Sequence, residues 1–171
     1  MTAQDALVRA LVDQHVRIRE LTRGLVRAGP DARPDALDRL VRLVAVHCAA
    51  ERVALAPPGE PPPENSPVDR DLVTALEGLD DVGAERPSST VHVGLVAAAL
   101  VRHAAAGERD TVPRFVATHD QFDIRWAATA LEAVDALVAD DGPTAAVPVE
   151  AGFRHQLRAA QDAVTEALRH G

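Results

Sequence analysis

Apolar positions along the chain recur at helical spacing, and Pro and Gly residues divide the pattern into segments. Leucine and isoleucine form one stripe of 3.6-residue period over residues 2–27, which ends at Gly29 and Pro30. A second stripe begins near Pro34 and continues to about residue 55. The pattern therefore predicts two long helices, which a short turn should pair in antiparallel fashion.

The rest of the chain continues this alternation of breaks and helical stripes. A segment rich in Pro and Glu, residues 57–67, lacks helical and strand patterns and is predicted to be an exposed connector. Further helices are predicted from residue 68 or 69 to 79, from Ser88 or Ser89 to about 107, over 112–139 and over 149–169. Four helices followed by two indicate an all-α bundle with a helical extension.

Composition supports the all-α class and argues against two classes of binding partner. Hydrophobic residues make up 47% of the 171 positions, but they are mostly Ala, Val and Leu; aromatics are only 2% and Tyr is absent, which favours helices. The net charge of −8 argues against nucleic acid or an anionic membrane as a partner. Neither a signal peptide nor a membrane-length apolar run is recognisable, so we expect a cytoplasmic protein.

Ionisable residues interrupt the apolar stripes at positions that should face the core. In the second helix, His47 and Glu51 lie one turn apart and continue the line of Leu40 and Val44. A carboxylate buried without a partner costs several kcal/mol, so Glu51 requires an arginine or a metal ion beside it.

Two other helices carry a histidine on the inward stripe. His15 lies on the face of Leu11 and Ile18, and His103 continues the line of Leu100. A lone core histidine is usually satisfied by a hydrogen bond, but three of them together with an inward glutamate indicate a metal site. Imidazole and carboxylate ligands suit iron or zinc, and helical bundles build such sites from facing positions.

The same spacing occurs twice: His47 precedes Pro57 by ten residues, and His103 precedes Pro113 by ten. With His15, and with Glu51 and Glu108 after the two histidines, this pattern resembles the hemerythrin HHE cation-binding family over roughly residues 5–117. The resemblance implies an up-and-down four-helix bundle over 1–117, with residues 118–171 as a helical extension packing on it. It also implies two irons, or one, and the matching ligand positions are His15, His47, Glu51, His103 and Glu108.

One departure from the family pattern lies in the third helix. Family members carry one or two histidines early in that helix, where this chain has Asp69 and Val73. Asp69 is an oxygen donor that can take the place of an imidazole; the alternative is that it caps the helix or faces the helix dipole.

A second departure follows His103, because Gly107 stands four residues on and the acid, Glu108, five residues on. In a regular helix, five residues leave Glu108 about 140° from His103 around the axis. Glu108 therefore needs a local π-type bulge to reach the metal. Gly107 lowers the free-energy cost of that distortion, because glycine tolerates irregular backbone angles. The alternative is a solvated surface acid.

Polar and aromatic residues also occur in the predicted extension. His119 and Asp123 lie one turn apart, like His47 and Glu51, and are candidates for an additional ligand pair. The alternative reading is a helix cap and a surface acid. Phe122 and Trp126 are predicted to pack in the core where this helix covers the bundle.

A site poor in histidine and rich in carboxylate favours oxidase, oxygenase or peroxidase chemistry, with O₂, peroxide or another small molecule as the reactant, over reversible O₂ carriage. Two alternatives stay open: a non-catalytic O₂ or iron sensing or storage module, and a metal-free structural bundle. Ligand type does not separate iron from manganese, and the C-terminal helices offer a face for a homodimer.

Overall fold

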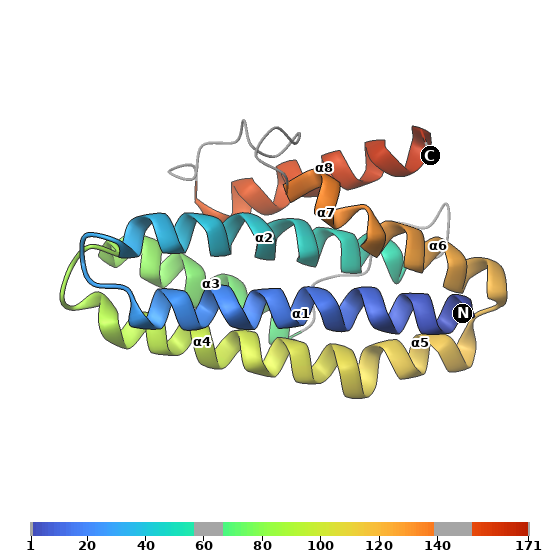
Figure 1. The fold of residues 1–171 in the computed structure, drawn as a ribbon, viewed down its shortest axis with the longest axis horizontal. Helices are drawn as coiled ribbons and strands as arrows, with labels where there is room; N and C mark the ends of the chain where they lie inside the picture. Colours follow the sequence, from blue (N-terminus) through green and yellow to red (C-terminus); the bar gives the residue numbers. More distant parts are fainter. Residues whose placement is uncertain (1, 57–66, 139–151, 171) are drawn as a thin grey trace.

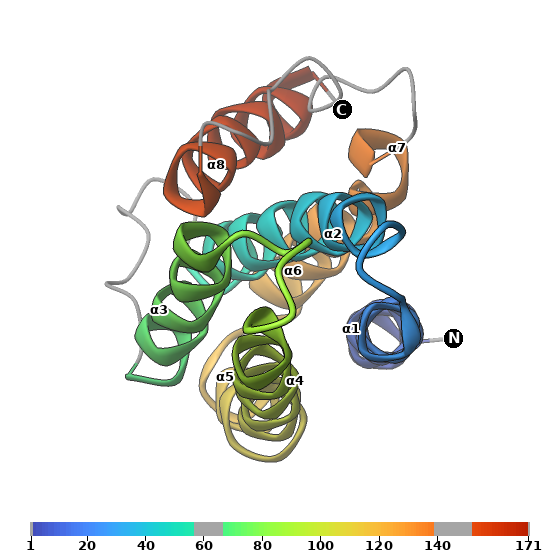
Figure 2. The same cartoon turned by 90° about the vertical axis from the view of Figure 1, so that its left-hand side faces the viewer.

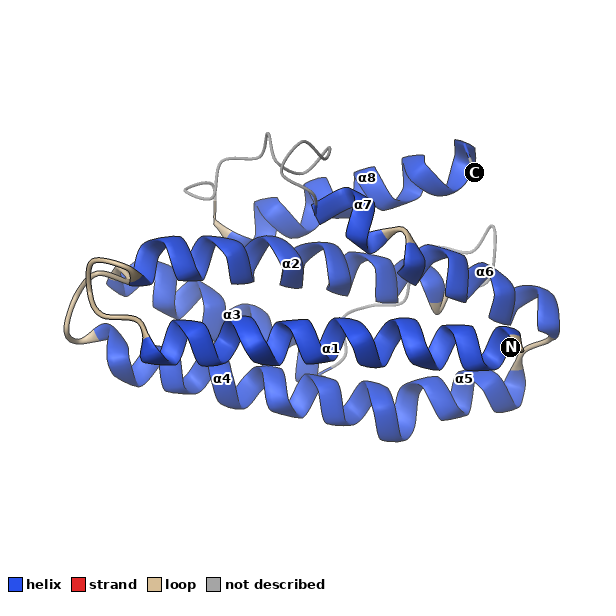
Figure 3. Cartoon of the chain, viewed as in Figure 1, coloured by secondary structure: helices blue, strands red, loops and turns tan. Residues whose placement is uncertain are grey.

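The structure, a computed structural model, describes residues 2–56, 67–138 and 152–170. Every regular element within these residues is a helix, as Figure 3 shows. The all-α prediction is thereby confirmed. The predicted connector 57–67, apart from its last residue, and the start of the last predicted helix lie outside the described residues.

Four helices correspond to the first four predicted segments: α1 (Ala3–Arg27), α2 (Arg33–Ala54), α3 (Pro67–Val82) and α4 (Ser89–Ala106). Helix α1 begins with a capping box in which Thr2 and Asp5 each accept a hydrogen bond from the other's backbone N–H. Proline in the first turn of α2 has no N–H to leave unsatisfied there. The four helices surround a shared interior when viewed along their axes (Figure 2).

The helical path continues beyond the end of α4 at Ala106. A π-helical turn, η1 (Gly107–Thr111), joins it directly to α5 (Val112–Thr118). The chain then turns at His119, whose backbone is extended, and α6 (Gln121–Glu132), α7 (Val134–Val138) and α8 (Phe153–His170) follow.

The predicted single helix over 112–139 is therefore wrong. The Asp120 carboxylate accepts hydrogen bonds from the backbone N–H groups of Phe122 and Asp123, which starts a new helix at this point. Phe122 is 63% exposed and does not pack in the core as predicted. The inward stripe of α6 consists instead of Ile124, Ala127, Ala128 and Leu131.

The later helices pack closely on the earlier ones. Helix α8 lies along α2 (Figure 1), and α6 packs against both α1 and α2. Leucines of α1, α2, α3 and α6 supply the largest fully buried side chains: Leu7, Leu11, Leu25, Leu40, Leu43, Leu72, Leu76, Leu79 and Leu131. Helix α6 is thus part of the core and not only a cover over it.

One described segment, Ser89–Thr118, is long and apolar enough to cross a membrane by length and composition alone. The same segment packs against α1 and α3 and contributes Val93, Val96 and Leu100 to the hydrophobic core. These three residues make the segment one of the core helices of the bundle.

Candidate metal centre

Three histidines from three helices meet in the interior. His15 of α1, His47 of α2 and His103 of α4 are 1%, 0% and 5% exposed. One nitrogen of each ring lies within 4.8 Å of the corresponding nitrogens of the other two. The rings meet edge to face, with centroids 4.9, 5.7 and 5.3 Å apart.

Glu51 completes the cluster from the next turn of α2. Its Oε2 lies 3.2 Å from His103 Nε2 and 3.7 Å from His47 Nε2. The residue is 8% exposed, so the carboxylate is nearly removed from water. The i, i+4 spacing that the sequence shows is what places Glu51 beside His47.

A buried amide fixes the orientation of the His47 ring. Gln14 donates its Nε2 to the backbone carbonyl of Leu131 at 2.6 Å, so its Oε1 faces His47. That oxygen accepts a hydrogen bond from His47 Nδ1 at 2.7 Å. In neutral His47 the single proton is therefore on Nδ1, and Nε2 presents a lone pair to the cluster.

Carboxylates hold the outer nitrogens of the other two rings. His103 Nδ1 donates to Asp69 Oδ1 at 2.9 Å, and His15 Nδ1 donates to Glu108 Oε1 at 2.9 Å. Arg19 also approaches Glu108 at 3.4 Å. Each neutral ring thus carries its proton on the outside and turns Nε2 inward.

This arrangement leaves lone pairs facing one another. The Nε2 atoms of His47 and His103 are 3.1 Å apart, and two unprotonated nitrogens at that distance repel unless a proton or a cation lies between them. His15 Nε2 is buried and has no hydrogen-bond partner among the described residues. Ligands that share one ion at about 2.1 Å lie roughly 3–4 Å apart, which the His47, His103 and Glu51 distances match.

The same surroundings shift the histidine pKa values in different directions. Burial lowers the pKa of His15, and lowers that of His47 further because His103 and His15 are close by. Burial alone would also lower the pKa of His103, but Glu51 and Asp69 outweigh it and raise the pKa to about 10. Without a metal, one proton is thus held on His103; a bound cation would displace it.

Gly107 allows the helices to approach at the centre. A Cβ at this position would lie 3.2 Å from Glu51 Oε1 and 3.3 Å from His15 Cε1, closer than most Cβ contacts. The π-helical turn that begins here confirms the predicted distortion and brings Glu108 to His15. Glu108 is a part-buried partner of a histidine rather than a solvated acid, and both His15 and Arg19 lower its pKa against the opposing effect of burial.

Of the six predicted ligands, the structure brings nitrogens of His15, His47 and His103 within 4.8 Å of one another and places Glu51 beside His47 and His103. It places Asp69 and Glu108 on the outer side of two of the imidazoles. Direct ligation by either of these carboxylates stays a prediction. Val73, at the second histidine position of the family pattern, is buried and lines a separate pocket between α3 and α8.

The two residues predicted as an additional ligand pair, His119 and Asp123, have other contacts. His119 stacks on Phe115, with ring centroids 4.0 Å apart, and its Nδ1 donates to the Phe115 carbonyl. Asp123 lies in the first turn of α6, where its N–H is bound by Asp120.

Sequence reasoning missed Gln14. It continues the stripe of Leu7, Leu11 and Ile18 and is 5% exposed, so a polar residue on an apolar stripe was the available signal.

A pocket of about 370 Å³ connects the cluster with the surface. Glu51, Asp69 and His103 lie on its inner side, and His119 and Phe115 are also in its wall. A small molecule entering here meets the open side of the cluster.

Comparison with family models, with curated proteins and with solved structures finds no match for this chain.

Proposed function

We propose that this chain is an iron-binding protein of hemerythrin-like type, in which α1 to α4 form an up-and-down four-helix bundle around the cluster. His15, His47 and His103 would bind the ion through Nε2, and Glu51 through a carboxylate oxygen. We propose one iron rather than two, because Asp69 and Glu108 are engaged as acceptors for His103 and His15. The order of the site residues along the chain, which resembles the hemerythrin pattern, supports iron, and the donors are compatible with it.

The observation that carries the proposal is the inward orientation of three Nε2 atoms. Gln14, Asp69 and Glu108 each accept from the outer nitrogen of one ring, and such partners fix the tautomer and orientation of metal-binding histidines. With the outer nitrogen of each ring engaged in this way, the inner nitrogens are the ones left to bind an ion, which would displace the proton held on His103. The Glu51 carboxylate supplies negative charge that offsets part of the charge of a divalent ion.

We further propose that the site carries out redox chemistry on O₂, peroxide or another small molecule. Iron, when bound, supplies one-electron chemistry that the side chains of this protein lack. The chain contributes four donors, which is fewer than the six that iron commonly takes, and the pocket of about 370 Å³ opens beside Glu51 and His103. His119 is a polar group in the pocket wall, where it is placed to orient an entering molecule.

Metal analysis of the protein, purified after anaerobic addition of Fe(II), tests this proposal. We expect about one iron per chain in the wild type and the same in His155→Ala, a matched change at an exposed histidine of α8. His47→Ala should lose most of the iron. Fewer than about 0.3 iron per chain in the wild type, or full iron in His47→Ala, would contradict the metal site.

Turnover separates the redox proposal from simple binding. We expect the iron-loaded protein to consume O₂ or peroxide over many cycles when a reductant is supplied, and His47→Ala to lose this activity. Stoichiometric, reversible O₂ binding would contradict catalysis and indicate a carrier or sensor. The absence of O₂ or peroxide consumption by the fully iron-loaded protein would contradict redox chemistry altogether.

A further inference from the structure

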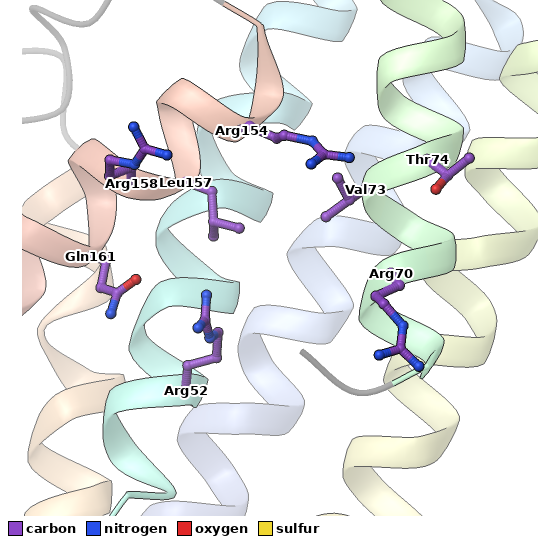
Figure 4. A pocket seen from close by; sticks show the side chains of 8 residues that line it. All are labelled: Arg52, Arg70, Val73, Thr74, Arg154, Leu157, Arg158 and Gln161. Atoms are coloured by element: carbon purple, nitrogen blue, oxygen red, sulfur yellow. The ribbon is translucent and has the colours of Figure 1, made fainter. Parts of the chain in front are cut away.

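Four arginines gather around a second pocket, on the opposite side of α2 from the α1 contact. Arg52 of α2, Arg70 of α3, and Arg154 and Arg158 of α8 line a pocket of about 380 Å³, as Figure 4 shows. The three helices come from distant parts of the chain, so the pocket exists only because α8 packs along α2 and contacts α3. None of the predicted metal-binding residues lines it.

The described lining of this pocket contains no acidic side chain. Arg154 is held at the rim by a two-point ion pair with Glu77 of α3. Arg70 and Arg158 are exposed and form no hydrogen bond or ion pair with another described residue. In a chain of net charge −8, these guanidinium groups stand out as a local concentration of positive charge.

Guanidinium groups of this kind suit oxyanions. Arginine presents N–H donors in a planar fork that matches both oxygens of a carboxylate or a phosphate. Bringing several arginines together costs repulsion, which a bound anion removes. The groups come from three helices, so an anion between them would be bound from more than one side.

The pocket also has an apolar part. Val73 and Leu157 are each 8% exposed and form its floor between the arginines. A volume of about 380 Å³ lies in the range of small-molecule sites. Apolar side chains next to several arginines suit a molecule that has a hydrophobic part and an anionic group.

We propose that this pocket binds a small organic anion, with its carboxylate or phosphate in the positive field of Arg70 and Arg158 and its apolar part against Val73 and Leu157. The net charge of −8 disfavours long polyanions such as nucleic acid, and an anionic membrane, because both approach the whole protein surface. A small anion experiences mainly the local field of the pocket. The proposal is independent of the proposed iron chemistry.

Calorimetric titration of the full chain with inorganic phosphate, phenyl phosphate and benzoate tests the proposal. We expect saturable binding of phenyl phosphate, of benzoate or of both, weakened by added salt. The more tightly bound of these two identifies the head group. Inorganic phosphate should bind more weakly than phenyl phosphate because it has no contact with the apolar floor.

Two variants and one control locate the site. Arg70→Gln and Arg158→Gln should each weaken binding about fivefold or more, since each removes a positive charge from the pocket wall. Both side chains are exposed, so the variants should keep the wild-type circular dichroism spectrum and iron content. Arg23→Gln, a matched change at an exposed arginine of α1, should bind as the wild type does.

Three results would overturn the proposal. The first is the absence of saturable binding of both organic anions at physiological salt. The second is unchanged affinity in both Arg70→Gln and Arg158→Gln. The third is arginine-dependent binding of RNA or of anionic vesicles without binding of the small anions, which would assign the surface to a macromolecule. Measuring the iron content of each variant shows whether the metal site is intact. A change in anion binding with unchanged iron content therefore concerns the anion pocket alone.

Discussion

Each histidine of the central cluster uses its two ring nitrogens differently. The outer nitrogen donates to an oxygen of Gln14, Asp69 or Glu108, and the inner nitrogen faces the other rings. The rings are therefore held in one orientation before any ion arrives, and each ring in its neutral form has one preferred tautomer. Such preorganisation reduces the conformational entropy lost on metal binding, because the side chains are already ordered.

Replacement of Gly107 tests how tightly this cluster is packed. In Gly107→Ala, the new methyl group would press on Glu51 and His15, so we expect iron affinity to fall about tenfold or more. The free energy of unfolding should change little. Alanine favours a helix by about 1 kcal/mol over glycine, and the backbone of Gly107 has ordinary helical angles. Competition with an iron chelator measures the affinity, and urea denaturation measures the free energy of unfolding.

Gly94→Ala is the matched control, because a Cβ there meets nothing within 4 Å. It should raise the free energy of unfolding and leave iron binding unchanged. Equal iron affinity in Gly107→Ala and the wild type would show that Glu51 and His15 move aside freely, against the packing argument.

At the level of single residues, the sequence predicted well what depends on helical periodicity. His15, His47, Glu51 and His103 are buried together because each continues an apolar stripe. Whether Asp69 and Glu108 meet the inner or the outer side of a ring depends on how neighbouring helices are shifted along each other, which periodicity does not resolve. Gln14 was missed because burying a neutral amide costs less free energy than burying a charge. Its presence on an apolar stripe therefore does not by itself require a metal ion or a counter-charge.

At the level of elements, the region after Gly107 contains one irregularity that the sequence predicted, the π-helical turn, and one that it did not, the break between α5 and α6. The π-helical turn was predictable because a five-residue spacing and a glycine both indicate an irregular helix there. The break at His119 and Asp120 was missed because apolar residues continue at helical spacing on both sides, at Phe115 and Ile124. The deciding feature is a single aspartate whose carboxylate can cap a helix or point to solvent.

Removal of that cap tests its role in separating α5 from α6. Asp120→Ala should lower the free energy of unfolding by about 1 kcal/mol, because two N–H groups at the start of α6 lose their acceptor. Urea denaturation with circular dichroism detection measures the change. Asp31→Ala, at an exposed aspartate in the turn before α2, should change stability by much less. Equal losses in both variants would show that the carboxylate of Asp120 is not a cap.

At the level of the whole molecule, the helical class and the four leading segments followed from the sequence, while the packing of the later helices did not. Helix α6 inserts Ile124 and Leu131 into the core, and α8 covers α2. Amphipathic patterns show that a helix has a partner, but they do not identify which of several apolar faces it chooses. The boundary predicted near residue 117 stays a prediction.

The stability of the whole metal-free protein should depend on pH through His103. Its pKa is raised from 6.5 to about 10 on folding, so its stabilising proton is fully present below about pH 6.5 and is lost as the pH rises toward 10. The free energy of unfolding should therefore fall by about 1 kcal/mol per pH unit above pH 7. The chain has no Lys or Tyr to titrate in this range.

Urea denaturation of the metal-free protein between pH 6.5 and about 8.5 measures this slope. That window stays below the range where the Cys48 thiol, whose pKa burial raises, adds an effect of its own. His103→Gln should flatten the slope. A flat profile in the wild type would contradict the raised pKa and the trapped proton.

The hydrogen bond from Gln14 to the Leu131 carbonyl gives α6 a role that its position in the sequence does not suggest. Without that carbonyl, the Gln14 amide has no reason to keep its oxygen toward His47, and a rotated amide would offer the ring a donor instead of an acceptor. The preferred tautomer of His47 would then change, and its inner nitrogen would carry the hydrogen. A helix outside the three that carry the cluster thus helps to set which nitrogen of His47 carries the hydrogen.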